Sequence, residues 1–300
     1  MPGSTASYRG RFAPSPTGPL HLGSLIAALA SYLDARACGG TWLVRMEDLD
    51  PPREEPGAAS AILTSLEVHG LLWDEEVLWQ SRRHDAYRNA LAQLQQNGHL
   101  FRCDCTRALL GPGGACRGRC LPRQAAVMDK HSTRVNVPAD TCVEFHDQLQ
   151  GPISENLGET LPDFTLLRKD GLFAYQLAVV VDDAFQDITH VVRGSDLLDS
   201  TPRQIFLQRL LGRRPPHYCH LPVITNDLHQ KFSKQNHAPA LDPEQAGPNL
   251  RRALEFLHQP APPPNARTPG EILASACEQW SAATIPAKMS QPASLLGPQV

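Results

Sequence analysis

The chain has 300 residues, of which 41% are hydrophobic and 20% charged, and this balance excludes a wholly disordered or fibrous protein. Its 28 Lys and Arg residues stand against 31 Asp and Glu residues, which gives a net charge of −3. A protein that coats nucleic acid non-specifically is usually strongly basic, so this chain either avoids nucleic acid or contacts it through a local basic patch.

No segment approaches the roughly 20 consecutive apolar residues of a membrane helix. The basic residues near the N-terminus are followed by no apolar segment of the kind found in secretory signals. We therefore expect a cytoplasmic protein that has no membrane partner and is a monomer.

Predicted strands and helices alternate over residues 8–100, which favours the first half of a parallel α/β domain. The predicted elements, in chain order, are a strand at 8–13, a helix at 20–37, a strand at 41–46, and helices at 58–69 and 82–97. Gly39 and Gly40 end the first of these helices.

The alternation stops at residues 101–172, which we interpret as an inserted subdomain with a strand at 135–145. Cys, Gly and Pro interrupt its first part, so we expect little regular structure there. Residues 173–240 return to the α/β pattern and complete the domain. The predicted elements there are strands at 172–181, 188–193 and 221–225 and a helix at 201–211.

The rest of the chain favours a short helical region at 241–288 and a frayed tail at 289–300. Two helices are predicted in this region, at 250–258 and 269–280. The proline run at 260–264 separates them and is stiff.

Four of the eight cysteines form the pattern C-x-C-x10-C-x3-C, as Cys103, Cys105, Cys116 and Cys120. Four thiolates at this spacing can close around a tetrahedral Zn²⁺ with every position filled by the protein. Such an ion stabilises a knuckle, here 103–120, whose own core would be too small. We predict one structural zinc ion per chain, with free thiols or a redox pair as the alternatives.

Residues 11–24, RFAPSPTGPLHLGS, predict a strand, a Pro/Gly loop and a helix that begins near His21. The N-terminus of a helix favours a phosphate or carboxylate group. Gly18 and Gly23 allow a ligand to approach the backbone, and His21 can donate a hydrogen bond to a phosphate oxygen. The alternative is an ordinary proline-rich turn before a capped helix.

A second cationic feature is the polar loop KFSKQ, in which Lys231 and Lys234 lie three residues apart. Two such lysines can offset the charge that develops on a transferring phosphoryl group. The alternative is a solvated basic loop.

Polar side chains also occur within or after the apolar strands, where parallel sheets bind ligands. Arginine pairs with carboxylates and glutamate accepts from an ammonium group, so together they can hold a zwitterion that carries an extra carboxylate. Internal ion pairs are the alternative. The residues concerned are Arg11, Arg45, Glu47, Asp48, Tyr175 and Arg193.

The two loop motifs resemble those of class I aminoacyl-tRNA synthetases of the glutamyl type. RFAPSPTGPLHLGS is similar to the HIGH signature, with Ser24 in place of the final His, and KFSKQ is similar to KMSKS. LVRMEDLDPPR and DDAFQDITHVVRGSDLLDSTPRQ also resemble glutamyl enzymes. The resemblance covers residues 8–240, with the motifs in the family's order.

The residues after 240 are too few for the anticodon-binding region of a full glutamyl enzyme, and this truncated core with a zinc knuckle resembles the glutamyl-Q tRNA(Asp) synthetase family. The resemblance implies a class I synthetase Rossmann-like α/β fold with an inserted zinc-knuckle subdomain. It also implies activation of L-glutamate by ATP and Mg²⁺, then transfer to queuosine in the anticodon of tRNA-Asp.

The same resemblance assigns residues to sites. It implies catalytic roles for His21 and Lys234. The implied glutamate pocket is Arg11, Ala13, Ser15, Glu47, Tyr175 and Arg193. The implied ATP site is Pro14, Thr17, Gly18, His21, Gly23, Ser24, Lys231, Ser233 and Lys234. Cys116 stands where relatives carry a tyrosine, which makes the zinc set a four-cysteine variant.

Two other functions fit the same residues. A minimal glutamyl-tRNA synthetase would charge the 3′ end of tRNA-Glu, and a non-catalytic zinc-containing module would only bind a partner. Basic residues that could contact an RNA despite the net charge of −3, or that simply form a solvated surface, are Arg117, Arg119, Arg123, Arg209, Arg213 and Arg214.

We predict that Lys234→Ala lowers kcat for adenylate formation by on the order of 10² to 10³, the loss expected for one electrostatic donor to the transition state. Glutamate-dependent ATP–pyrophosphate exchange measures this rate. An unchanged kcat would contradict the role of Lys234.

Overall fold

The computed structural model describes residues 7–225 and 239–296. Its strands are β1 (Arg9–Phe12), β2 (Thr41–Met46), β3 (Leu78–Trp79), β4 (Leu100–Cys103), β5 (Ser132–Asn136), β6 (Cys142–Asp147), β7 (Gly151–Asn156), β8 (Asp163–Leu167), β9 (His190–Gly194), β10 (His217–Leu221), β11 (Val223–Thr225) and β12 (Ser290–Pro292). Its α-helices are α1 (Leu22–Ala37), α2 (Ala58–Val68), α3 (His84–Gln96), α4 (Leu157–Thr160), α5 (Tyr175–Phe185), α6 (Thr201–Leu210), α7 (Ala246–Phe256) and α8 (Pro269–Glu278).

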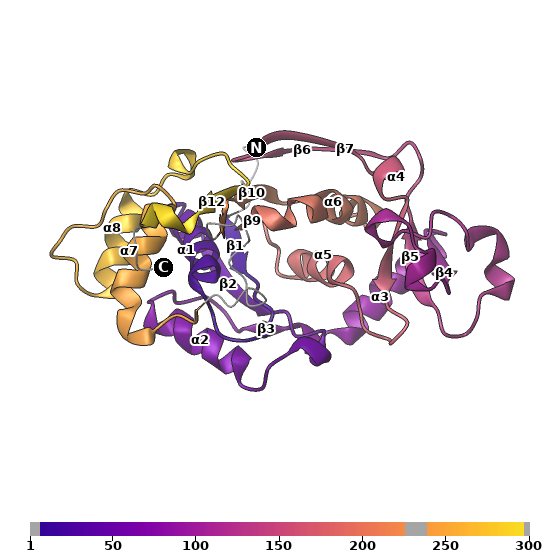
Figure 1. The fold of residues 1–300 in the computed structure, drawn as a ribbon, viewed down its shortest axis with the longest axis horizontal. Coiled ribbons are helices and arrows are strands. Elements are labelled where there is room, and N and C mark those ends of the chain that lie inside the picture. The colour runs from indigo at the N-terminus through magenta and orange to yellow at the C-terminus, as the bar shows by residue number, and fades with distance from the viewer. Residues whose placement is uncertain (1–6, 226–238, 297–300) are drawn as a thin grey trace, which may run out of the picture.

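Two distant parts of the sequence build the central parallel layer. β1 pairs in parallel with β2, which pairs in parallel with β3, and β9 pairs in parallel with β10. The two parts meet where the amide of Thr189 donates to the carbonyl of Arg9 at 3.0 Å. Helices lie on both sides, with α1 on one and α5 and α6 on the other (Figure 1). This arrangement confirms the predicted α/β fold with a parallel sheet.

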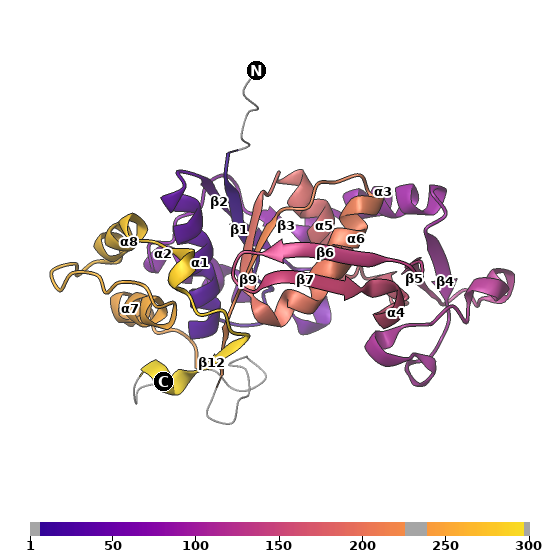
Figure 2. The same ribbon diagram turned by 90° about the horizontal axis from the view of Figure 1, so that it is seen from above.

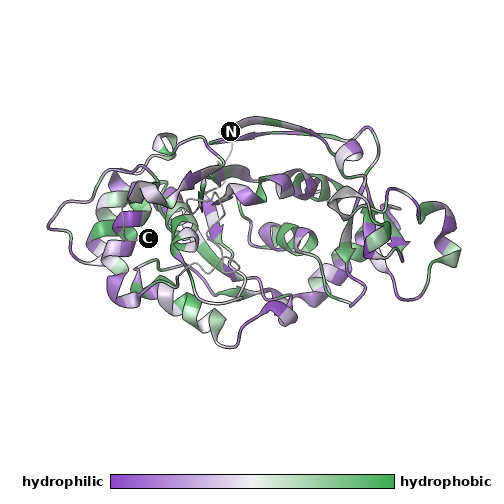
Figure 3. Cartoon of the chain, in the orientation of Figure 1, coloured by the Kyte–Doolittle hydropathy of each residue, from purple (hydrophilic) through white to green (hydrophobic). Residues whose placement is uncertain are grey.

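Burial explains why the first strands and helix form where they do. Leu43 and Val44 of β2 are inaccessible to solvent, as expected for a parallel strand covered on both faces. Leu25, Leu29 and Leu33 of α1 are also fully buried, since this helix lies between the sheet and helices α7 and α8. Figure 3 shows apolar residues concentrated on α1 and α5 in the middle of the molecule.

The insertion combines a small antiparallel sheet, ordered β4-β5-β8, with the hairpin β6–β7. The single strand expected at 135–145 is two strands, because the chain turns between β5 and β6. β6 then pairs in parallel with β10 at Asp147 and Tyr218. The hairpin therefore runs back along the molecule from the insertion to the central sheet (Figure 2).

The structure corrects the strand expected at 172–181, where Tyr175 begins helix α5 instead. This apolar run contains three valines in succession, Val179–Val181, and is buried on most sides, so neither composition nor periodicity separates a helix from a strand. Packing against α3 and α6 decides the outcome.

The expected frayed tail is also different in part. β12 pairs in parallel with β11, and the carbonyl of Met289 accepts a hydrogen bond from the amide of Val223 at 3.0 Å. The tail is ordered at this point because its backbone groups form hydrogen bonds with the edge of β11. Within the described residues, the helices are all too short or too polar to cross a membrane.

Candidate functional site

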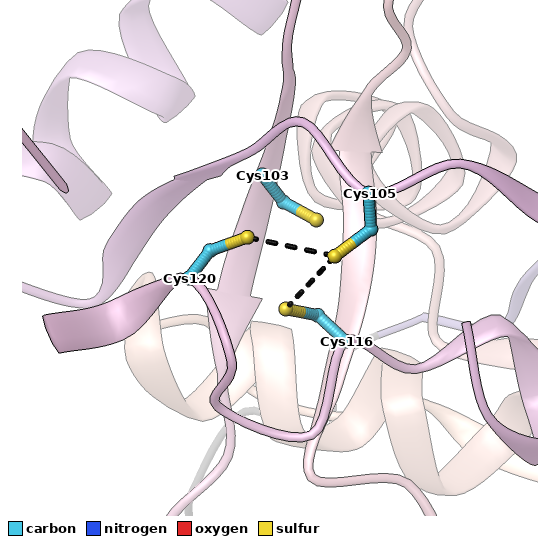
Figure 4. Close-up of side chains that lie close together, drawn as sticks. All are labelled: Cys103, Cys105, Cys116 and Cys120. Carbon is cyan, nitrogen blue, oxygen red and sulfur yellow. Dashed lines mark hydrogen bonds between the residues drawn. The ribbon is translucent and has the colours of Figure 1, made fainter. Parts of the chain in front are cut away.

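The four clustered cysteines lie at the far end of the insertion and converge on one point (Figure 4). All four are buried, and their sulfur atoms lie within 4.8 Å of one another. Cys105 Sγ is 3.9 Å from Cys116 Sγ and 3.6 Å from Cys120 Sγ. Tetrahedral bonds of about 2.3 Å to one metal ion place thiolate sulfurs about 3.8 Å apart, so the arrangement fits a single ion.

Neighbouring polar groups hold this cluster in place. Arg123 Nη2 donates to Cys120 Sγ at 3.3 Å, and Lys169 Nζ donates to the carbonyls of Asp104 and Cys105 at 2.7 and 2.8 Å. Burial raises the pKa of Cys105 to about 11. A bound cation would favour the thiolate form that burial disfavours. The cysteine cluster can therefore bind a metal ion.

A separate cavity of about 850 Å³ opens where the carboxyl ends of the central strands meet α1. It draws its walls from β1, β9 and β11, from the residues that follow β2, from α1, and from the start of α5. The predicted site residues on these walls are Arg11, Ala13, Pro14, Ser15, Thr17, His21, Gly23, Ser24, Glu47, Tyr175 and Arg193. The fold thus brings segments more than 150 residues apart to one ligand-sized space.

One end of the cavity is the N-terminus of α1. His21 is its N-cap residue, and the ring Nδ1 accepts a hydrogen bond from the amide of Ser24 at 3.2 Å. Since Nδ1 is the acceptor, the proton of the neutral ring lies on Nε2, which remains a donor. A Cβ atom on Gly23 would lie 3.1 Å from the His21 ring, so glycine lets this ring sit against the helix.

Gly18 is not among the residues that line the cavity, and its role in ATP binding stays a prediction. Its φ of +132° is one that other residues rarely adopt. A Cβ atom there would also lie 3.0 Å from the Glu55 carboxylate. Gly18 therefore shapes the loop and does not itself line the cavity.

A buried cluster of two arginines and two carboxylates includes two residues of the cavity wall, Arg11 and Glu47. Asp183 of α5 contacts Arg11 Nε at 3.0 Å and Arg45 Nη2 at 2.7 Å. Burial alone would raise the pKa of Asp183, but the two guanidinium groups hold it below its usual value. Asp183 is therefore ionised and aligns Arg11 of β1 with Arg45 of β2.

Glu47 completes this cluster. Its Oε1 lies 3.6 Å from Arg45 Nε, too far for a hydrogen bond, and among the described residues it has no hydrogen-bond donor. Burial raises the pKa of Glu47 to about 7, although Arg45 and Arg11 oppose the shift. A ligand's ammonium group could supply the missing donor and stabilise the ionised form. Arg193, whose Nη1 donates to Tyr175 Oη at 3.3 Å, lines the same cavity.

The remaining predicted site residues, Lys231, Ser233 and Lys234, lie outside the described residues. The described chain on either side of them borders the His21 end of the cavity. Ile224 of β11 lines it, and Ala240 forms a bridge with His21.

Sequence reasoning missed Asp183, which pairs with Arg11 on the cavity wall and with the buried Arg45. The signal was present, because Asp182 and Asp183 end a run of valines and a buried acid needs a cationic partner. It also missed the outer wall, where Asp50, Arg168 and Phe173 lie. Arg168 Nη1 contacts Asp50 Oδ1 at 3.3 Å, which links the insertion to the loop after β2.

We predict that Glu47→Gln changes how the stability of the ligand-free protein depends on pH. The folded-state pKa of Glu47, about 7, lies above its ordinary value of 4.5, so the folded protein binds the proton more tightly than the unfolded chain. Raising the pH between these values therefore costs the wild type stability, by about 2–3 kcal/mol. Glutamine cannot ionise, so the variant lacks this loss.

Urea denaturation across that pH range measures the difference. Glu76→Gln, at an exposed position, serves as the matched control and should retain the wild-type dependence. The same pH dependence in Glu47→Gln as in the wild type would show that Glu47 is not held protonated by burial.

Comparison with known proteins agrees with this geometry. The sequence matches the family described as tRNA synthetases class I (E and Q), catalytic domain, over residues 7–111 and 122–247. The chain is 53% identical to the glutamyl-Q tRNA(Asp) synthetase of Thiobacillus denitrificans over 94% of this chain and 96% of that protein. It is 50% identical to the enzyme of the same name from Pseudomonas fluorescens, over 96% of this chain and 97% of the relative.

Solved structures show the same fold. The glutamate-tRNA synthetase of Elizabethkingia anophelis superposes with a TM-score of 0.80 at 24% identity, covering 95% of this chain and 68% of that one. The family match omits residues 112–121, which include Cys116 and Cys120 of the metal-binding cluster. On the family match and the near full-length identity, the chain belongs to the class I tRNA synthetases (E and Q) and, among them, to the glutamyl-Q tRNA(Asp) synthetases.

Proposed function

We propose that this chain activates L-glutamate with ATP and transfers the glutamyl group to the queuosine base in the anticodon of tRNA-Asp. The observation that carries the proposal is the single cavity, which joins a helix N-terminus to a buried set of arginines and a carboxylate. The names of the relatives, which match this chain over almost its full length, indicate the RNA acceptor.

The amino acid occupies the end of the cavity near β1 and β2. The Glu47 carboxylate accepts from the ammonium group of glutamate, and Arg11 and Arg193 pair with its carboxylates. Ala13 and Ser15, in the loop after β1, line the space beside them. Tyr175, which contacts Arg193, closes the same wall. Glutamate carries one ammonium and two carboxylates, and these charges match the groups on the walls.

ATP occupies the His21 end. The first turn of α1, with Gly23 and Ser24 on the cavity wall, presents the positive end of the helix dipole to the phosphates. His21 donates through Nε2. The loop residues Pro14 and Thr17 line the cavity beside it. Lys231, Ser233 and Lys234 follow β11, whose end borders this part of the cavity, and are assigned here from their motif. Mg²⁺ enters with ATP and neutralises phosphate charge.

Activation requires no nucleophile from the protein. The glutamate α-carboxylate is ionised, and its oxygen attacks the α-phosphorus of ATP while the bond to the bridging oxygen breaks. The products are glutamyl-adenylate and pyrophosphate. The protein contributes by positioning the reactants and stabilising charge, so His21 and Lys234 act mainly in the transition state. A hydroxyl of the queuosine cyclopentenediol then attacks the adenylate carbonyl and releases AMP.

The RNA contacts the exposed basic side chains, because a chain with a net charge of −3 needs a local cationic surface. Arg117, Arg119 and Arg123 are exposed on the cysteine-bearing segment of the insertion, and Arg209 and Arg213 are exposed at the end of α6. These positions support an RNA-binding role.

Transfer to the acceptor tests the proposed function directly. Radiolabelled glutamate is offered to tRNA-Asp with and without queuosine and to tRNA-Glu, and ribonuclease cleavage separates the anticodon fragment from the 3′ end. We expect label only in the anticodon fragment of queuosine-containing tRNA-Asp. Label at the 3′ end of tRNA-Glu would identify a minimal glutamyl-tRNA synthetase, and no labelling or ATP–pyrophosphate exchange would identify a binding module.

The metal in the cysteine cluster is, in our proposal, one structural Zn²⁺ held by Cys103, Cys105, Cys116 and Cys120. Four protein ligands leave no open position for chemistry. Among the described residues, the buried apolar side chains that pack with these cysteines are Phe101 and Val127, too few for a core of their own. The ion therefore supplies folding energy to this part of the insertion.

We expect Cys116→Ser to reduce zinc well below one ion per chain and to lower Tm by about 5 °C, since an incomplete site binds zinc more weakly. Elemental analysis and thermal unfolding of the purified protein measure both. Cys142→Ser, at an exposed cysteine, is the control and should keep its zinc. Full zinc content in Cys116→Ser would remove Cys116 from the ligand set.

A further inference from the structure

Arg193 is supported from outside the cavity by a histidine and an aspartate. His220 lies on β10 and Asp147 at the end of β6, and both are fully buried and absent from the cavity walls. Neither residue can therefore touch a ligand in the cavity. Their contacts with each other and with Arg193 form a continuous chain of hydrogen bonds.

The guanidinium group of Arg193 is held at several donors. Its Nε donates to His220 Nε2 at 3.0 Å, and its Nη2 donates to Thr201 Oγ1 at 2.8 Å. Its Nη1 donates to Tyr175 Oη at 3.3 Å, on the cavity side. These contacts determine the plane of the guanidinium and leave Nη1, with its second N–H, as the atom that can face a ligand.

The contact with Arg193 determines the tautomer of His220. Arginine offers only donors, so His220 Nε2 must be the acceptor and the ring proton must lie on Nδ1. Nδ1 in turn lies 2.6 Å from Asp147 Oδ2. Burial and the charge of Arg193 lower the pKa of His220, although Asp147 opposes the shift. The lowered pKa favours the neutral ring.

The hydrogen bonds of Asp147 keep the ring proton of His220 on Nδ1. Its Oδ1 accepts from the amides of Leu149, Gln150 and His220 at 3.0, 2.9 and 3.2 Å, which leaves Oδ2 for the His220 ring. Burial opposes ionisation, but the hydrogen bonds from His220 and Gln150 hold the pKa of Asp147 below its usual value. The carboxylate is thus an acceptor only, and the inserted hairpin β6–β7 delivers it to the central sheet.

We propose that Asp147 and His220 are positioning residues for glutamate binding, which select the histidine tautomer that orients Arg193 toward the substrate carboxylate. This inference rests on the proposed function, in which Arg193 binds glutamate. The insertion then has a second role besides carrying the cysteine cluster. It supplies Asp147, which positions Arg193 without contacting the ligand.

Asp147→Asn is the first test. Asparagine keeps an oxygen for the backbone amides but presents an NH₂ group to His220 Nδ1, which makes Nδ1 an acceptor and moves the ring proton to Nε2, against Arg193. We expect KM for glutamate to rise by about tenfold to a hundredfold, the range for losing a hydrogen bond to a charged group. KM for ATP should stay unchanged, because the ATP end of the cavity does not contact Arg193.

A matched pair at His220 tests the same idea without depending on the folding of Asp147→Asn. His220→Gln places an amide oxygen near the position of Nε2 and can still accept from Arg193, whereas His220→Leu has a similar size and no acceptor. We expect glutamate KM near the wild-type value for Gln and raised at least tenfold for Leu. His69→Gln, at a buried histidine that contacts Ser65 and Asn249, is the control and should match the wild type.

Glutamate-dependent ATP–pyrophosphate exchange gives KM and kcat for all variants, and thermal unfolding reports their stability. A raised glutamate KM in His220→Leu together with rescue in His220→Gln supports the proposal. Equal KM values in these two variants, or equal increases of KM for glutamate and ATP, would overturn it. Absence of exchange in the wild type would instead contradict the proposed function, so the two failures are distinguishable.

Discussion

The substrate end of the cavity depends on the pairing of Asp183 with Arg11 and Arg45. One buried carboxylate on α5 holds two arginines on adjacent strands, and the neighbouring Glu47 is left with a raised pKa and an oxygen that lacks a hydrogen-bond donor among the described residues. Removing one member of such a buried ion pair leaves the other charge without a partner, which typically lowers the free energy of unfolding by about 3–5 kcal/mol. The cluster therefore stabilises the fold, and it also positions the charged groups that line the cavity.

That charge pattern is the basis of the proposed substrate. In the proposal, a zwitterion with a second carboxylate supplies an ammonium to Glu47 and carboxylates to Arg11 and Arg193. The opposite end offers amides at the start of α1 and the Nε2 donor of His21. In the proposed function, the two ends of one cavity bring a substrate carboxylate close to a phosphate, and positioning of this kind supplies much of the catalysis in phosphoryl chemistry.

The insertion separates the two halves of the central sheet in the sequence, but its strand β6 pairs with β10 of that sheet. Its distal part carries the four cysteines, which lie close enough together to bind a metal ion and have few buried apolar residues around them. Its hairpin returns along the molecule, joins the central sheet beside β10 and buries Asp147 behind the cavity (Figure 2). The segment thus links the end that carries the cysteine cluster and exposed arginines to the residues that contact Arg193.

The sequence alone determined the parallel α/β pattern, the cysteine cluster and eleven of the residues on the cavity walls, because these depend on local periodicity and on motifs that are contiguous in the chain. It did not determine that the valine-rich run after Tyr175 is a helix, since a segment buried on most sides shows neither period clearly. Only the tertiary structure brought Asp183 between Arg11 and Arg45, and Asp147 behind His220. These contacts join residues 73 to 172 positions apart, and no local pattern encodes which buried acid meets which base.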